Sequence, residues 1–342
     1  MRFGHFCLPT YTPEVDGEIG DYMHRWLDLL VESEELGFDE LWCNEHHFHS
    51  YGGIIPSTPM LLSALAQRTR RARLGTSIVV LPLHNPIEVA EQFAMVDLMS
   101  GGRVQLGVGR GFVTRDYEVF GIPVEEGQDR LTEGLDVILK AWQGGPMSHH
   151  GTYHHFENVD VWPKPEQSPR PPIFVACTSN PKSFEWVGQQ GFNLLTVAYG
   201  PGFQDVSALN DIYRSAWNAA GHPANGWAIN THYQVVVAET SAEAREICVP
   251  ALIRYRQAVI SSRRLLAPEE PPDYERLLAT SRIISGTPDE CAQQLRAAQQ
   301  QVGFTCADLM FYWAGIPYET ARRSLHLFAS EVMPKLREPV AA

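Results

Sequence analysis

The chain has 342 residues, of which 44% are hydrophobic and 20% charged, a composition typical of a folded globular protein and not of a disordered one. Its net charge of −13 repels phosphate backbones and anionic lipid, so nucleic acids and membrane surfaces are not expected partners. The sequence contains no apolar run of about 18 residues that would predict a membrane span. The six cysteines form no regular framework, which favours a reducing, cytoplasmic location.

Strand and helix patterns alternate along the chain. Short apolar runs predict strands, and apolar residues at helical spacing predict the helices between them. In chain order the predicted elements are strand 2–7, helix 21–36, strand 38–43, helix 57–70, strand 73–81, helix 86–99, strand 103–108, helix 128–143, strand 173–176, helix 182–190, strand 192–197, helix 204–220, strand 233–238, helix 241–262, helix 287–301, strand 306–313 and helix 321–336.

Eight strands, each followed by a helix, are the arrangement of a TIM barrel. We therefore predict a single α/β domain over residues 1–342, a (β/α)8 barrel with insertions at about 144–172 and 266–285. A doubly wound parallel sheet is the alternative, although it usually has fewer strands or a second domain. Because TIM barrels carry their chemistry at the carboxyl ends of the strands, the residues after each strand are the site candidates.

A histidine-rich segment, NEHHFH at 44–49, follows the second predicted strand. Imidazole titrates near neutral pH, so a histidine here suits a base or hydrogen-bond donor; the alternative is a polar loop that satisfies backbone groups. A metal site is less favoured, because His46 and His47 are adjacent and lack the i, i+4 spacing that presents two ligands to one ion. The four histidines within 149–155 lack partners at fixed spacing, so we expect them in a solvated loop.

Two segments indicate a phosphate site. Glycines at 107, 109 and 111 surround Arg110 after the fourth strand, where the backbone can approach a ligand and the guanidinium can bind a phosphate. After the fifth strand, Thr178 and Ser179 precede a helix that includes Ser183, and hydroxyls before a helix N-terminus form an anion site or an ordinary N-cap. Together the two segments predict a phosphorylated cofactor.

The sequence resembles the bacterial luciferase-like flavin monooxygenases, in particular the luciferase alpha subunit. The shared segments follow one another in order along nearly the whole chain. They include MRFGHF at 1–6, GFD at 37–39, EHHF at 45–48, LGT to LP at 74–82, MSGGR at 99–103, GRG at 109–111, VFG at 119–121, GTPDEC at 286–291 and FASEVMPKL at 328–336.

The resemblance implies a TIM barrel that binds reduced FMN at the carboxyl face and reacts with oxygen to form a C4a-(hydro)peroxyflavin, which oxygenates a small apolar carbonyl or terpenoid-like substrate. It assigns His46 to hydrogen bonding and proton transfer. It assigns the FMN phosphate to Arg110 and Arg130, and to the hydroxyls of Thr178, Ser179 and Ser183. It also implies a non-proline cis peptide at Ser77–Ile78 beneath the flavin ring.

Further implications concern partners. No NAD(P)H fingerprint is present, so a separate NAD(P)H:flavin reductase is the implied source of reduced FMN. A homodimer is expected, with a heterodimer as the alternative. The polar stretch at 266–285 lies where the family has a mobile lid.

The sequence departs from the luminous enzymes at two places. Gly109 replaces their reactive cysteine, and residues 197–201 differ from their tryptophan-bearing segment, so a long-chain aldehyde substrate and light emission are not expected. Two other functions remain open. One is an F420-dependent dehydrogenase on the same barrel, and the other is a non-catalytic flavin-binding accessory subunit, which would be expected to lack the histidine at position 46.

Overall fold

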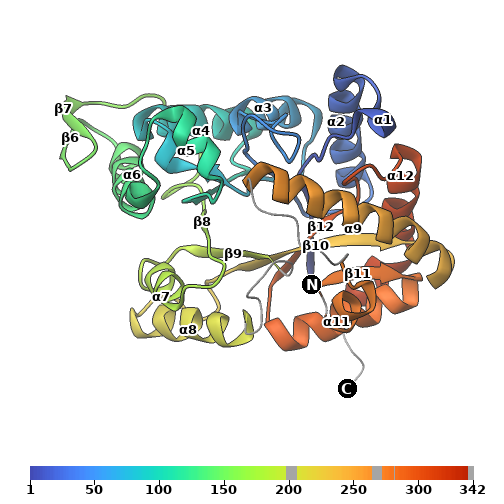
Figure 1. Ribbon diagram of the computed structural model, residues 1–342. Coiled ribbons are helices and arrows are strands. Elements are labelled where there is room, and N and C mark those ends of the chain that lie inside the picture. Colours follow the sequence, from blue (N-terminus) through green and yellow to red (C-terminus); the bar gives the residue numbers. More distant parts are fainter. Residues whose placement is uncertain (198–205, 264–271, 281, 338–342) are drawn as a thin grey trace.

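Eight short, buried strands close into a barrel, with helices around it (Figure 1). The computed structural model describes residues 1–197, 206–263, 272–280 and 282–337. Neighbouring strands pair in parallel around the ring, β9 pairs with β10, and β12 returns to β1. The ring consists of β1 (Arg2–Cys7), β2 (Glu40–Cys43), β3 (Arg73–Thr76), β5 (Val104–Gly109), β8 (Ile173–Ala176), β9 (Asn193–Val197), β10 (Ile229–Val237) and β12 (Cys306–Met310). The predicted TIM barrel is confirmed.

The helices pack their apolar sides onto this barrel. In α11, Thr287 accepts a hydrogen bond from the backbone of Glu290, whose carboxylate accepts one from the backbone of Thr287, so a capping box begins the helix. None of the described helices is both long and apolar enough to cross a membrane. The helices are α1 (Pro13–Asp16), α2 (Ile19–Glu35), α3 (Thr58–Arg68), α4 (Pro86–Ser100), α5 (Thr114–Phe120), α6 (Gly127–Gln143), α7 (Pro181–Gln189), α8 (Val206–Ala219), α9 (Ser241–Arg263), α10 (Tyr274–Ala279), α11 (Pro288–Val302), α12 (Tyr318–Leu327) and α13 (Met333–Arg337).

The third predicted strand, 73–81, is interrupted. β3 ends at Thr76, the Ser77–Ile78 peptide bond is cis, and the chain resumes as the short strand β4 (Val79–Val80) before a 3-10 turn. β4 pairs with β5, and the Ser77 backbone N–H donates to the Cys43 carbonyl over 2.7 Å. The expected cis peptide is therefore present, and it lies where β2, β3 and β5 end.

The first insertion contains an antiparallel hairpin, β6 (Met147–His150) and β7 (His155–Val159), which extends beside α6 (Figure 1). The expectation of a solvated histidine loop is wrong for His149 and for the loop conformation, although His150 and His155 are exposed. His149 is only 7% exposed, and its Nε2 lies 3.4 Å from Oε1 of Glu133 on α6. Glu133 also accepts backbone N–H groups from 152–154, so a half-buried carboxylate holds the hairpin turn.

The second insertion differs from its prediction as well. Residues 266–271 and 281 lie outside the described residues, and the remainder contains α10 and a strand that the sequence did not predict, β11 (Ile283–Gly286). β11 extends the barrel wall because it pairs in parallel with the second half of β10. The lid stays a prediction.

Candidate active site

His46 lies just beyond the carboxyl end of β2 and is 8% exposed. Aromatic rings surround its imidazole: the ring centroids of Tyr51, His49 and Phe112 lie 5.1, 5.5 and 5.6 Å away. Gly52 adopts a φ of +75°, and a Cβ there would lie 2.7 Å from Cδ2 of His46, so the loop closes onto the imidazole only with glycine at this position. His46 is therefore fixed in a largely water-free aromatic setting.

The adjacent His47 turns to different partners. Its Nε2 lies 3.1 Å from Oε1 of Glu45, and Nε2 of His84 lies 2.7 Å from the same oxygen. Burial acts to raise the pKa of Glu45, but the hydrogen bonds from His47 and His84 outweigh it and lower that pKa. These three residues form one group that could hold a metal ion, and His46 is not a member of it, so the adjacent histidines do not face one ion.

Sequence reasoning missed Asp116 on α5. Its carboxylate lies within 4.8 Å of ring nitrogens of His46 and His49, and the residue is 2% exposed. Burial raises its pKa from 3.8 to about 6, and the negative charge of Glu45 adds to the effect while His47 opposes it. The sequence around Asp116 does not indicate that its carboxylate lies beside His46 and His49, because only the packing of α5 against the histidine segment brings them together.

The Ser77–Ile78 segment forms the neighbouring part of the same face. Both side chains are half-buried, and Oγ of Ser77 lies 2.7 Å from Nε2 of His232 on β10. Gly109 on β5 faces this segment: a Cβ at that position would lie 2.5 Å from Cδ1 of Ile78. The glycine therefore permits close approach of β5 to Ile78, in addition to any role beside a ligand.

The positive charges of Arg110 and Arg130 both lie close enough to Tyr117 to influence its pKa. Arg110 is exposed just after β5, and its carbonyl accepts the hydroxyl of Tyr117. Burial raises the pKa of Tyr117 to about 12, against the positive charges of both arginines. Arg130 donates to Glu126 over 2.8 Å and stacks 4.4 Å above the ring of Tyr153. The structure thus brings the two predicted phosphate arginines to one region.

The hydroxyl segment lies at the end of the next strand, because Val108 of β5 pairs with Val175 of β8. Thr178 and Ser179 are exposed, and Ser183 is half-buried. The N-cap of α7 is Asn180, whose side chain accepts the Lys182 backbone N–H over 3.1 Å. The hydroxyls of Thr178 and Ser179 are therefore not used for capping, and they make no hydrogen bond with the described residues.

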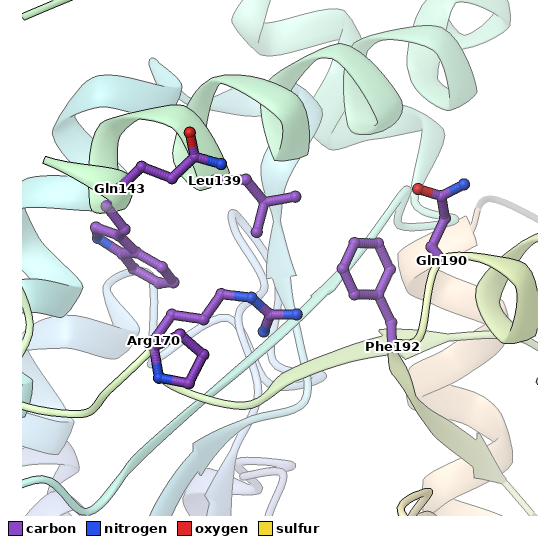
Figure 2. Close-up of a pocket in the computed structure, with 7 residues that line it drawn as sticks. Leu139, Gln143, Arg170, Gln190 and Phe192 are labelled. Atoms are coloured by element: carbon purple, nitrogen blue, oxygen red, sulfur yellow. The ribbon is translucent and has the colours of Figure 1, made fainter. Parts of the chain in front are cut away.

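α9 covers this end of the barrel. Its Tyr255 hydroxyl lies 2.9 Å from the hydroxyl of Tyr51, and its Arg254 donates to the Ala314 carbonyl over 2.6 Å. A separate cavity of about 260 Å³ lies at the opposite end, where Arg170 precedes β8 and Phe192 precedes β9 (Figure 2). Figure 2 shows Arg170 directed toward Phe192. The guanidinium carbon of Arg170 lies 5.7 Å from the centroid of the Phe192 ring. That cavity is not part of the candidate site.

Comparison with known proteins identifies the family. The model of luciferase-like monooxygenases matches residues 1–306. The chain belongs to the luciferase-like monooxygenase family. It is 29% identical to the 4-hydroxyprotoasukamycin monooxygenase of Streptomyces nodosus subsp. asukaensis, over 98% of this chain and 92% of that one. It is 28% identical to the oxygenase component of the flavin-dependent trigonelline monooxygenase of Acinetobacter baylyi, over 91% and 89% of the two chains.

The crystal structure of monooxygenase RslO1 from Streptomyces bottropensis is similar to this luciferase-like monooxygenase throughout. The TM-score is 0.90 at 31% identity, and the match covers 98% of this chain and 99% of that chain. The prediction of a luciferase-like, flavin-dependent monooxygenase is confirmed, so this enzyme is an oxidoreductase with a flavin cofactor.

The residues present suit the phosphate end of such a flavin. Arg110 supplies a guanidinium that is exposed at the carboxyl face, and the neighbouring hydroxyls of Thr178 and Ser179 are not used elsewhere among the described residues. Charged donors and hydroxyls beside the N-terminus of α7 are the donor set that phosphate prefers.

Proposed function

We propose that this enzyme is the oxygenase component of a two-component system. It takes reduced FMN from a separate NAD(P)H:flavin reductase and uses O2 to oxygenate a small apolar carbonyl or terpenoid-like substrate. The observation that carries the proposal is that His46, Ser77–Ile78 and Arg110 follow three neighbouring strands at one end of the barrel. The name of the trigonelline relative, an oxygenase component, supports the two-component arrangement.

Reduced FMN, when bound, supplies together with O2 the oxygenating chemistry. Arg110 and Arg130 hold its phosphate by charge-assisted hydrogen bonds, and Thr178, Ser179 and Ser183 add hydroxyl donors. Ser77–Ile78 supports the ring. The nearby Tyr117 hydroxyl is neutral at neutral pH, as tyrosine ordinarily is, and burial raises its pKa further, to about 12, so it adds no negative charge beside the phosphate.

His46 holds and moves a proton at its imidazole, in a setting from which the surrounding rings exclude water. Three phenylalanines remain exposed near the histidine loop: Phe48 at 55%, Phe112 at 44% and Phe120 at 43%. Phe112 packs on His46, while Phe48 and Phe120 pack on His47. Exposed rings beside the buried imidazole favour an apolar substrate.

The phosphate assignment is tested by comparing FMN with riboflavin, which lacks the phosphate. We expect Arg110→Ala to weaken FMN binding by about 10- to 100-fold, because a hydrogen bond to a charged group contributes about 1.5–3 kcal/mol, and to leave riboflavin binding unchanged. Arg115→Ala, at an exposed arginine paired with Glu118, is the control. Equal FMN affinities of Arg110→Ala and the wild type would remove Arg110 from the site.

Titration with F420 in the same experiment separates the two cofactors. Tighter binding of F420 than of FMN, with substrate oxidation in the absence of O2, would establish the dehydrogenase alternative instead.

The role of His46 is tested by His46→Gln, with the exposed His24 of α2 changed to Gln as the control. We expect His46→Gln to abolish oxygenation and to leave the FMN dissociation constant within about threefold, since the change removes a proton carrier and not a phosphate ligand. Full oxygenation by His46→Gln would overturn the assignment. Flavin binding by the wild type without turnover over a broad substrate panel would support an accessory subunit.

The exposed apolar side chains of α3 and α4 support a homodimer. Met60 of α3 is 75% exposed and Met95 of α4 is 52% exposed, and Leu98 and Met99 follow Met95 at i+3 and i+4 on the same face of α4. We expect Met60→Glu to convert a dimer to a monomer in light scattering, and Val15→Glu, at an exposed apolar residue of α1, to have no effect. A wild-type monomer would refute the homodimer.

A further inference from the structure

Buried polar side chains cross the inside of the barrel beneath Ser77. Asn230 and His232 are two residues apart on β10 and therefore point to the same side of the strand. Asp308 lies opposite His232 on β12, and Glu40 comes from β2. None of these four residues is more than 1% exposed, and the mechanism proposed above uses none of them.

The contacts form a chain that ends at Ser77. His232 Nε2 lies 2.7 Å from Ser77 Oγ, and the ring of Phe6 packs 4.2 Å from the imidazole. On its other side, Nδ1 of His232 has no hydrogen-bond partner among the described residues, and Oδ2 of Asp308 lies 3.5 Å away. Asn230 Nδ2 donates to Glu40 over 2.8 Å and lies 3.2 Å from Oδ2 of Asp308.

The charges of this interior decide where the protons lie. Burial, with the nearby charge of Glu40, raises the pKa of Asp308 well above its usual value. Glu40 is also paired with Arg2, whose Nη1 lies 2.9 Å from its Oε1, while Cys306 lies 3.4 Å from Asp308. Burial lowers the pKa of His232 to about 3. Both shifts favour the uncharged forms of these two side chains, and the imidazole of His232 is neutral at neutral pH.

The hydrogen bonds available to the neutral imidazole of His232 leave one consistent direction of donation. Nδ1 makes no hydrogen bond with the described residues, whereas Nε2 lies 2.7 Å from Ser77 Oγ, and a buried N–H without an acceptor is costly. The imidazole therefore keeps its proton on Nε2 and donates it to Ser77 Oγ. The hydroxyl proton of Ser77 is then directed away from His232, toward the open carboxyl face. The opposite tautomer would make Ser77 the donor to His232, with no proton left for a ligand.

We propose that His232, oriented by Asp308, is a positioning residue that fixes the Ser77 hydroxyl as a hydrogen-bond donor to the flavin ring. The inference rests on the proposed function, because the ring lies over Ser77–Ile78 only in that account. A donor to the ring stabilises the electron-rich reduced flavin more than the oxidised flavin, so the dyad of His232 and Asp308 favours retention of reduced FMN.

The test measures the dissociation constants of oxidised and of photoreduced FMN, the latter without oxygen. His232→Phe keeps a ring against Phe6 and removes both nitrogens, and Ser77→Ala removes the hydroxyl itself. We expect each to lower the preference for reduced over oxidised FMN about tenfold, which corresponds to about 30 mV for a two-electron couple. In the double variant the preference for reduced FMN should fall no further than in either single variant, because all three variants lack the same fixed hydrogen-bond donor.

A second buried pair provides a matched control. Nδ1 of His5 lies 2.6 Å from Ser33 Oγ, His5 is fully buried, and burial lowers its pKa to about 3 as well, but its partner lies on α2 outside the barrel. We expect His5→Phe to leave the redox preference unchanged. Asp308→Asn should keep the redox preference close to that of the wild type, because the amide has the same shape as the carboxyl beside His232 and keeps a polar group there.

The outcomes separate this inference from the proposed function. Wild-type preference in folded His232→Phe and Ser77→Ala would overturn the positioning role and leave FMN binding intact. Absence of FMN binding by the wild type would overturn both. Ser77→Ala alters a half-buried residue, so it tests the donor even where His232→Phe does not fold.

Discussion

Two glycines of β5 should respond very differently to alanine. A Cβ at Gly107 would overlap the backbone carbonyl oxygen of Thr76 and lie 2.9 Å from Cδ1 of Leu195. A backbone oxygen cannot move aside cheaply, and overpacking costs about 1–3 kcal/mol. The Thr76 hydroxyl donates to the Gly107 carbonyl over 2.7 Å and accepts the Gly107 N–H over 2.9 Å. Disruption of these two hydrogen bonds would cost about 1 kcal/mol of stability for each. We expect Gly107→Ala to lower the free energy of unfolding by about 3–5 kcal/mol.

At Gly109 the obstacle is a flexible side-chain end. The new Cβ would lie 2.5 Å from Cδ1 of Ile78 and 3.3 Å from Cβ of Ala176, so Ile78 has only to change its side-chain torsion. That costs about 0.5–1.5 kcal/mol, which the reduced flexibility of the unfolded chain offsets by about 0.4–1 kcal/mol. Gly109→Ala should therefore be nearly as stable as the wild type, but the moved Ile78 should weaken FMN binding about tenfold, or about 1.4 kcal/mol.

Urea unfolding and FMN fluorescence titration of both variants measure these quantities. Equal stability losses at the two positions would refute the distinction between the backbone and side-chain obstacles. An unchanged FMN affinity in Gly109→Ala would remove Ile78 from the flavin site.

Two further predictions concern carboxylates, the buried one of Asp116 and the half-buried one of Glu133. The pKa of Asp116 in the folded protein, about 6, lies above the usual 3.8, so the folded protein binds the proton more tightly than the unfolded chain. The free energy of unfolding therefore declines as pH rises from about 4 to about 6. Urea unfolding on both sides of that window should show that Asp116→Asn lacks this decline, and a pH profile identical to that of the wild type would exclude Asp116 as its source. Glu133→Gln weakens the acceptor for three backbone N–H groups, so in hydrogen-exchange measurements the amides of 152–154 should exchange with solvent at least about tenfold faster. Exchange as slow as in the wild type would show that the carboxylate does not hold the turn.

Much of the barrel could be predicted because its signals are local. Runs such as Ile173–Ala176 are continuous and apolar, as expected for strands buried on both faces, and glycines mark several helix ends. β11 could not be predicted in this way, because four residues become a strand only through pairing with β10. The hairpin of the first insertion was not predicted for a similar reason, since its order depends on contacts with Glu133, which belongs to a different element, α6.

The residues of the candidate site likewise fall into those that local sequence signals predict and those that only tertiary packing brings to the site. His46 and Arg110 directly follow predicted strands, so barrel geometry and family resemblance together single them out. Asp116 and His232 do not, because a helix brings Asp116 to the histidine loop and the inside of the barrel brings His232 to Ser77. Their functions depend on burial and on partners more than sixty residues away, which no local pattern encodes.

The most direct test of the central claim mixes the protein with photoreduced FMN and oxygenated buffer in a stopped-flow spectrometer. An oxygenase of this kind is predicted to give an oxygen-dependent absorbance band, distinct from that of oxidised FMN, that outlasts the reoxidation of free reduced FMN and decays faster when the substrate is present. Direct reoxidation at the rate of free FMN, with the protein in excess and the flavin shown to be bound, would contradict the account.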